Sequence, residues 1–300
     1  MFEAHSGELA ALATVLCWSI TAIAFEAAGK RVGSLPLNII RLAAAFVLLS
    51  VFNTFYRGAA FPLDANGTQW FWLGLSGIVG FAVGDLCFFR ALVLIGARRA
   101  SLVMLTLAPP FAAVIGWLVL GERLGMLELG GMVLTVSGIA LVILERRKAN
   151  GGGTGESVWP GVLLAVLGAL GQAAGAVISK LGMVDMDPAG ATQIRVIAGL
   201  LGFALIFTVS GWWGRVFAAF KDRVALGQMG IGSFFGPFLG VTLFQAALKL
   251  TEAGVAQTIA ALVPVVIIPF SIVVFKDKVN WRSIVGAMIA VSGVSLLFLR

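Results

Sequence analysis

Ten long apolar runs, joined by short polar connections, decide what this chain of 300 residues can fold into. About 20 apolar residues in a helix span the roughly 30 Å hydrocarbon core of a bilayer, and each run approaches or exceeds that length. The runs cover residues 8–29, 36–56, 70–93, 100–120, 127–145, 158–180, 189–210, 226–249, 254–275 and 282–299. We therefore predict an all-α polytopic membrane protein with ten transmembrane helices.

The composition agrees with burial in lipid. Hydrophobic residues make up 60% of the chain and charged residues only 12%, whereas soluble domains are about 25% charged. The runs are continuous rather than alternating, which excludes the strands of a membrane barrel. The first run is expected to remain as a spanning helix, because the preceding MFEAHSGE has no Lys or Arg.

Lysine and arginine fall mainly in the connections after the first, third, fifth, seventh and ninth runs. Cytoplasmic connections carry such an excess. We therefore expect both termini on the periplasmic side of a bacterial-type cytoplasmic membrane. The same flanking charges account for the net charge of +7, so the lipid bilayer is the expected partner and nucleic acid is not.

The two halves of the chain repeat each other. VSGIALVIL at 136–144 returns as VSGVSLLFL at 291–299, 155 residues later. At the same offset Pro109 aligns with Pro264. Matched prolines and charged turns in one register are much rarer by chance than matched apolar residues, so an internal duplication is indicated.

Each half holds five runs. Two tandem units with an odd number of spans cross a membrane in opposite senses, an arrangement found in many secondary transporters. We predict two inverted five-helix repeats, residues 1–147 and 158–300, joined by a cytoplasmic Gly-rich linker at 148–157. Because one chain holds both halves, a monomer would suffice for function.

Several short motifs carry a family resemblance: APP at 108–110 and VP at 263–264, the turns GER at 121–123 and KDK at 276–278, and the closing VSGxxLxxL. With ten spans arranged as five plus five, the chain resembles the EamA-type exporters of the drug/metabolite transporter superfamily, and most of all their aromatic amino acid exporters. The resemblance implies export of small metabolites by alternating access, through a cavity lined mainly by the first, third, fourth, sixth, eighth and ninth runs. It implies no cofactor.

Prolines and glycines inside runs are candidate hinges. Proline removes a backbone hydrogen bond and kinks a helix, and small residues let helices approach and slide. The candidates are Pro109, Pro110, Pro264, Pro269, Pro237, Gly236 and Gly240. The glycines, together with the Gly80–Gly84 and Gly171–Gly175 pairs, also fit close packing alone.

Five ionisable residues lie at lipid depth, where a charge is costly. They are Glu26, Arg41, Asp85, Arg90 and Arg195. The first four are expected toward the cytoplasmic ends of their helices, where they would neutralise one another as a cluster. They serve either as paired charges that fix helix ends or as a cytoplasmic gate, for which Asp85 is the best single candidate.

The uncharged helix middles offer amides, hydroxyls and aromatic faces, which suit an apolar or zwitterionic small molecule. Phosphorylated cargo would need Lys or Arg there. We predict a substrate cavity lined by Trp18, Ser19, Thr21, Phe81, Phe88, Met104, Thr106, Gln172, Gln245 and Gln257. Each aromatic also fits lipid contact, and each glutamine also fits a bond between helices.

The function these patterns predict is export of aromatic or hydrophobic amino acids. Broad drug or metabolite efflux by proton antiport is the main alternative, followed by nucleotide-sugar transport and by a membrane protein that does not transport. Enzymatic chemistry is not expected, because the only histidine, His5, lies in the N-terminal tail and no catalytic or metal-binding motif occurs. The middle of the first run, VLCWSITAI at 15–23, holds no carboxylate, so facilitated diffusion stays open beside proton coupling.

Overall fold

The structure is a computed structural model that describes residues 5–145, 159–268 and 281–298. Within these ranges every regular element is helical, with two π-helical segments labelled η. The elements are α1 (Ser6–Val32), α2 (Ser34–Tyr56), α3 (Gly67–Gly77), η2 (Ile78–Gly84), α4 (Asp85–Leu120), α5 (Met126–Glu145), α6 (Trp159–Gly182), α7 (Pro188–Ser210), α8 (Trp213–Ala219), α9 (Arg223–Ser233), η4 (Phe234–Gly240), α10 (Val241–Leu250), α11 (Ala253–Ala260) and α13 (Trp281–Leu297).

Seven helices are long and apolar enough to cross a membrane, and three shorter helices are also apolar. Each falls on one of the predicted runs, so the chain is an all-helical protein of the polytopic membrane class. Three predicted features lie outside the described residues: the linker at 148–157, Pro269 and the KDK turn at 276–278.

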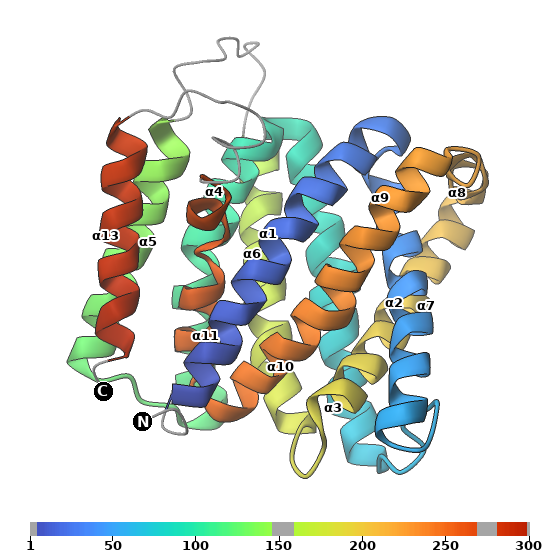
Figure 1. The fold of residues 1–300 in the computed structure, drawn as a ribbon, viewed down its shortest axis with the longest axis horizontal. Coiled ribbons are helices and arrows are strands. Elements are labelled where there is room, and N and C mark those ends of the chain that lie inside the picture. Colours follow the sequence, from blue (N-terminus) through green and yellow to red (C-terminus); the bar gives the residue numbers. More distant parts are fainter. Residues whose placement is uncertain (1–4, 146–158, 269–280, 299–300) are drawn as a thin grey trace.

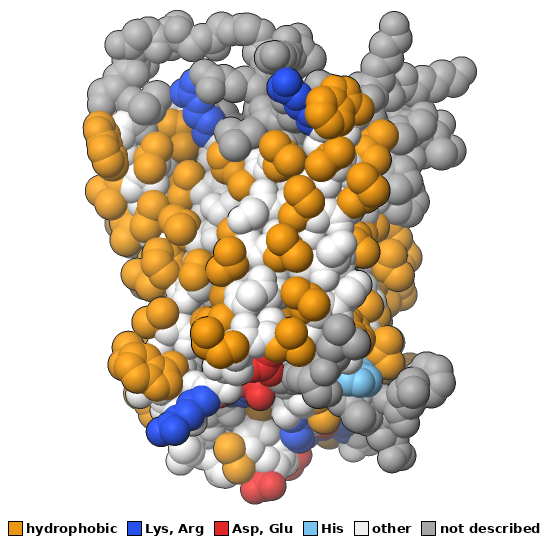
Figure 2. All heavy atoms as spheres, turned by 90° about the vertical axis from the view of Figure 1, so that its left-hand side faces the viewer, with side chains coloured by type: hydrophobic (Ala, Val, Ile, Leu, Met, Phe, Trp, Pro, Cys, Tyr) orange, Lys and Arg blue, Asp and Glu red, His pale blue; other side chains and the backbone are white. Residues whose placement is uncertain are grey.

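The surface agrees with a membrane setting. On the face drawn in Figure 2, apolar side chains cover the band between the two ends, and the coloured Lys, Arg, Asp and Glu side chains gather near those ends. Large apolar residues such as Val133, Leu205 and Val209 are exposed. Such a band matches acyl chains, and helices satisfy their own backbone hydrogen bonds there.

The helices run up and down through one bundle (Figure 1). α1 begins and α13 ends at the same end, where the ring centroids of His5 and Phe298 are 5.6 Å apart. We call this the terminus end. α1 and α5 end, and α2 and α6 begin, at the opposite end, which we call the linker end.

α5 and α13 lie side by side and pack through glycines (Figure 1). Gly131 lies against Gly293, and Gly138 lies against Gly286, so closely that neither has room for a side chain. In the 155-residue register, 131 corresponds to 286 and 138 to 293. The contacts are therefore reciprocal, as at an interface across a two-fold axis.

Other helix pairs follow the same pattern. α1 packs along α9, η4 and α10, whereas α6, its counterpart in the register, packs along α3, η2 and the first part of α4. α2 packs on its counterpart α7. Thr135 Oγ1 donates to the carbonyl oxygen of Ala290 at 3.4 Å, and these two residues are 155 positions apart.

Glycine stripes bring these helices together. Gly171 and Gly175 of α6 lie against Gly84 and Gly80, with no space for a β-carbon between the backbones. In the second half a stripe of Gly232, Gly236 and Gly240 lies against Phe25, Thr21 and Trp18 of α1 in that order. Both stripes pack helices closely against each other, which is one of the two interpretations that the sequence left open for these glycines.

Two π-helical segments, η2 and η4, interrupt α-helices at nearly corresponding positions in the two halves of the chain. η2 separates α3 from α4, and η4 separates α9 from α10. They start 156 residues apart, at Ile78 and Phe234. π segments occur frequently at functional sites, and both of these touch the cavity described below.

The predicted proline kinks differ between the halves. α4 keeps helical dihedral angles through Pro109 and Pro110, and its one non-helical residue is Gly96, with a φ of 81°, at the junction of the spans Gly67–Gly96 and Arg99–Leu120. Glycine adopts that φ without a steric penalty. In the second half α11 ends at Ala260 and helix resumes at 263, so Pro264 falls in a first helical turn, where its missing N–H forfeits no bond. A break accompanies the proline only in the second half.

Candidate functional site

A cavity of about 300 Å³ lies inside the bundle. Helices from both halves form its walls: α1, α2, η2, α4, α6, η4, α10 and α11. The predicted residues that line it are Trp18, Thr21, Phe81, Phe88, Met104, Gln172 and Gln257, the hinge candidates Pro109, Gly236 and Pro237, and the charged residues Arg41 and Asp85. The structure thus brings together side chains that are far apart in the sequence.

Other predicted residues lie elsewhere. Ser19 donates to the carbonyl oxygen of Val15, and Thr106 to that of Leu102, both at 2.7 Å, so each hydroxyl is satisfied within its own helix. The predicted residues that do not line the cavity are Ser19, Thr106, Gln245, Pro110, Pro264, Gly240, Glu26, Arg90 and Arg195.

Ten further residues line the cavity that the sequence analysis did not select: Ala22, Leu42, Phe89, Ser101, Leu105, Ala108, Val241, Ala260, Ala261 and Val263. Helical spacing could have found several of them. Phe89 follows Asp85 by four residues, and Met104, Leu105 and Ala108 follow Ser101 by three, four and seven. These are the spacings that place side chains on one helix face.

Arg41 and Asp85 form an ion pair in the cavity wall. Arg41 Nη2 donates to Asp85 Oδ2, and Gln172 Nε2 on α6 donates to Asp85 Oδ1 at 2.9 Å. The arginine and aspartate side chains are 15% and 7% exposed. The sequence predicted these charges toward the cytoplasmic ends of their helices and a largely uncharged cavity. In the structure this one charge pair belongs to the cavity wall, and the other described lining residues are uncharged.

The other members of the predicted charge cluster do not join this pair. Glu26 pairs with Lys30 at 2.6 Å on the exposed surface of α1. Arg90 is exposed on α4. Only Arg41 and Asp85 remain of the four-residue cluster that the sequence suggested, since the side chains of Glu26 and Arg90 find solvent or a neighbour on their own helix.

Arg195 of α7 is buried behind the cavity wall. Its Nη1 donates to Gln245 Oε1 at 2.5 Å, and Ser179 Oγ donates to the same oxygen at 3.2 Å. The guanidinium lies 5.0 Å from the ring centroid of Phe81, which itself lines the cavity. Gln245 therefore holds a buried arginine rather than facing the cavity.

Polar contacts join the helices at the terminus end. Lys180 Nζ binds the carboxylate of Glu122 and donates to the carbonyl oxygen of Thr251 at 2.7 Å. Glu122 Oε2 also accepts the backbone N–H of Ala253 at 2.9 Å. An apolar layer that includes the fully buried Ala11 lies on the same side. The cavity is displaced toward the linker end, where Ser101, near the start of the 99–120 span, contributes to it.

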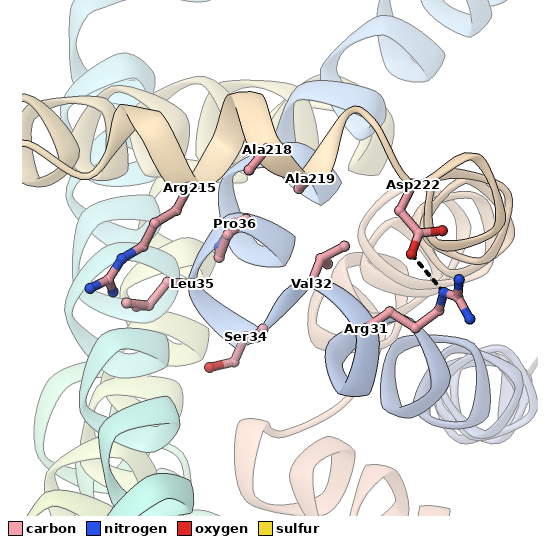
Figure 3. A pocket seen from close by; sticks show the side chains of 10 residues that line it. Arg31, Val32, Ser34, Leu35, Pro36, Arg215, Ala218, Ala219 and Asp222 are labelled. Atoms are coloured by element: carbon pink, nitrogen blue, oxygen red, sulfur yellow. Dashed lines mark hydrogen bonds and ion pairs between the residues drawn. The ribbon is translucent and has the colours of Figure 1, made fainter.

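A second pocket, of about 500 Å³, lies at the linker end between the α1–α2 turn and α8 (Figure 3). Arg31 Nε donates to Asp222 Oδ2 at 2.8 Å across it. Asp222 caps α9 by accepting the backbone N–H of Ala225 at 3.0 Å. That backbone bond first, and Arg31 second, lower the pKa of Asp222. This carboxylate therefore stays ionised at neutral pH and fixes the start of α9.

In the ranges that the structure describes, no three His, Cys, Asp or Glu side chains come together as metal ligands. Cys17 is buried and Cys87 half-buried, and both are free thiols. The cavity is thus the part of the described chain that best fits a small molecule.

Known proteins resemble the chain along most of its length. A chloroplastic WAT1-related protein of Arabidopsis thaliana is 27% identical over 198 residues, covering 64% of this chain but only 45% of the plant protein. A protein of Archaeoglobus fulgidus named as an uncharacterized transporter is 22% identical over 300 residues, 97% of each chain. A crystal structure of another protein matches with a TM-score of 0.78 at 18% identity, covering 98% of this chain and 96% of that one, which indicates a shared fold.

The EamA-like transporter family matches residues 5–144 and 159–299. These two ranges include every residue that lines the cavity. Since the match takes in nearly the whole chain, and the relative from Archaeoglobus fulgidus aligns from end to end, the chain belongs to the EamA-like transporter family.

Proposed function

We propose that this protein is a secondary transporter that exports small metabolites, with aromatic and hydrophobic amino acids as its main substrates. The cavity carries the proposal: it is formed by both halves of the chain, measures about 300 Å³ and has one charge pair among apolar and aromatic side chains. Pockets for small molecules are of this kind, mostly apolar with a few placed polar groups. Membership in a transporter family favours transport over catalysis.

The proposed architecture is ten transmembrane helices in two inverted five-helix repeats. Reciprocal glycine contacts between α5 and α13 support it, as do the matching helix pairs and the nearly matching π segments. The family match also falls in two ranges of similar length. A monomer holds both repeats and is the proposed functional unit.

The proposed mechanism is alternating access. Tight packing and the Glu122–Lys180 pair lie on the terminus-end side of the cavity, so this conformation is assigned to the state that faces the linker end. Lys and Arg are concentrated at that end of the predicted spans, which favours a cytoplasmic orientation by the positive-inside rule. The termini would then be periplasmic, in a cytoplasmic membrane.

Broad drug efflux is the second candidate, and the aromatic wall formed by Trp18, Phe81, Phe88 and Phe89 favours it, because such faces accept varied apolar molecules. Nucleotide sugars fit less well. Their phosphates call for several cationic side chains, and among the described residues that line the cavity Arg41 is the only cation.

Uptake by purified protein in liposomes tests the proposal. Labelled phenylalanine, tryptophan and threonine are compared with a cationic dye, with and without a pH gradient. We expect the protein to accelerate phenylalanine and tryptophan most. Acceleration of the dye alone would replace amino-acid export by drug efflux, and a strict need for the gradient would favour proton coupling over facilitated diffusion.

A further inference from the structure

The Arg41–Asp85 ion pair lies in the wall of a cavity that is otherwise mostly apolar. Taking two charges out of water is costly, and a buried pair is often no more stabilising than apolar residues of the same size. Both side chains are nevertheless largely buried, on α2 and at the start of α4. They are also the only ionisable residues in the described cavity lining. Stability alone is therefore a weak reason for the pair.

The arginine has hydrogen-bonding capacity to spare. A guanidinium carries five N–H donors, and within the described residues Arg41 donates only to Asp85. Its Nε is buried without a partner. The guanidinium lies over the rings of Phe25 and Phe89, with Cζ 5.9 and 5.8 Å from the two ring centroids. Arg41 is thus fixed in place, with donors left for another anion.

The aspartate is held from the other half of the chain. Gln172 of α6 donates to Asp85 Oδ1 at 2.9 Å, and Arg41 occupies Oδ2. A carboxylate has about four lone-pair sites, so two contacts leave room for a donor from the cavity. Gln172 and Asp85 both line that cavity.

We propose that Arg41 and Asp85 together form a subsite for the ammonium and carboxylate groups of a free α-amino acid. The substrate carboxylate binds the spare N–H groups of Arg41, and the substrate ammonium binds Asp85. This inference rests on the proposed transport function and specifies how the same cavity selects its cargo. The apolar side chain of the substrate then lies against Trp18, Phe81 or Phe88.

Charge balance favours a zwitterion over related ions. The wall has one positive and one negative side chain, so a zwitterion leaves the cavity neutral and gives each wall charge a second charged partner. An amine without the carboxylate, or an acid without the ammonium, adds a net charge and leaves one wall group without its new partner. A site built to hydrogen-bond a substrate group strongly rejects an analogue that lacks that group.

Competition with labelled phenylalanine in liposomes tests the subsite. The competitors are unlabelled phenylalanine, phenethylamine, which lacks the carboxylate, and 3-phenylpropionate, which lacks the ammonium. For the wild-type protein we expect phenylalanine to compete roughly tenfold or more better than either analogue. Equal competition by all three compounds would overturn the proposal while leaving amino-acid transport in place.

Two charge-neutralising variants sharpen the test. Arg41→Gln leaves a net negative wall, so phenethylamine should become the better analogue, whereas Asp85→Asn leaves a net positive wall and should favour 3-phenylpropionate. A pair that merely braces α2 against α4 would not produce opposite changes. Arg90→Gln, which removes an exposed arginine of α4 outside the cavity lining, is the control and should keep wild-type selectivity.

The outcomes separate the two proposals. Wild-type selectivity in both folded variants would overturn the subsite. If a variant does not fold, the wild-type competition series decides by itself. Absence of phenylalanine flux in the wild-type protein, with flux of the cationic dye, would instead contradict the proposed function.

Discussion

At the residue scale, two glutamines that look alike in the sequence have different surroundings. Gln257 of α11 lines the cavity. Gln245 of α10 is fully buried, and its Oε1 accepts hydrogen bonds from Arg195 and Ser179. The first can reach a substrate, whereas the second satisfies a buried cation. Substitution should therefore affect transport in one case and stability in the other.

Gln245→Ala should lower the free energy of unfolding by about 1–3 kcal/mol, because it leaves the Arg195 guanidinium buried without an acceptor. Gln257→Ala should change the stability little and raise the KM for phenylalanine uptake. Thermal unfolding in detergent and uptake kinetics in liposomes measure the two effects. A stable Gln245→Ala protein with altered KM would show that Gln245, not Gln257, faces the substrate.

The residues of the site could be predicted in part from the sequence. Most aromatic and amide candidates line the cavity because each lies in the middle of a span, and depth is readable from the apolar runs. The sequence suggested a cluster of four charges, but not that Arg41 and Asp85 alone would pair, because that choice depends on the rotation of α2 and α4 about their axes. Ser19 and Gln245 also lie in the middle of a span but do not line the cavity. The sequence shows how deep a residue lies in the membrane but not in which direction its side chain points.

At the scale of elements, α6 depends on glycine where it meets η2. A β-carbon on Gly171 would lie 2.8 Å from Gly84 Cα, and one on Gly175 would lie 3.0 Å from Gly80 Cα. Backbone atoms cannot move aside as a flexible side chain can. Even one methyl group should therefore push the two helices apart.

Gly171→Ala and Gly175→Ala should each lower the free energy of unfolding by roughly 1–3 kcal/mol through overpacking. Gly230→Ala is the matched control, because no atom lies within 4 Å of its added β-carbon. Alanine favours helix over glycine by about 1 kcal/mol, so the control should be neutral or slightly stabilised. Thermal unfolding midpoints compare the three, and equal midpoints would mean that α6 and η2 are not in close contact.

The elements themselves were largely predictable. Apolar runs fix where a spanning helix begins and ends, and α2 and α7 start within two residues of the predicted runs and end with them. The π segments and the short α8 were not predicted, whereas the break at Gly96 falls between the predicted runs 70–93 and 100–120. The features that were not predicted depend on how neighbouring helices pack, and an apolar run does not indicate which helices will be its neighbours.

At the scale of the whole molecule, the repeat in the sequence predicted which helices are counterparts, but not which pairs touch. α1 packs along α9, η4 and α10, and α6 packs along α3, η2 and α4. Both contacts depend on the glycine stripes, and in the first of them Trp18 and Thr21 lie opposite the glycines. The proposed alternating access requires that the cavity can close at the linker end and open at the terminus end. The polar contacts at the terminus end are the place to test that requirement.

The accessibility of single introduced cysteines would show which end of the cavity is open. The background for this experiment is a protein in which the free thiols Cys17 and Cys87 are replaced by alanine. Ser101→Cys lies in the cavity wall nearest the linker end, and a membrane-impermeant maleimide should label it from that side. Ala11→Cys lies in the packed layer at the terminus end, where Ala11 is 0% exposed. It should be labelled slowly from either side.

Glu122→Gln should change this pattern, because it removes the charge that binds Lys180 while keeping an acceptor for Ala253. The pair is mostly shielded from solvent, so its loss leaves Lys180 without its counter-charge and should weaken closure of the terminus end. Ala11→Cys should then be labelled at least severalfold faster from that side. Lys30→Gln, which breaks an exposed pair with Glu26, should leave labelling unchanged, since surface pairs contribute about 0–1 kcal/mol. If Glu122→Gln also leaves labelling unchanged in a folded protein, the Glu122–Lys180 pair does not control closure.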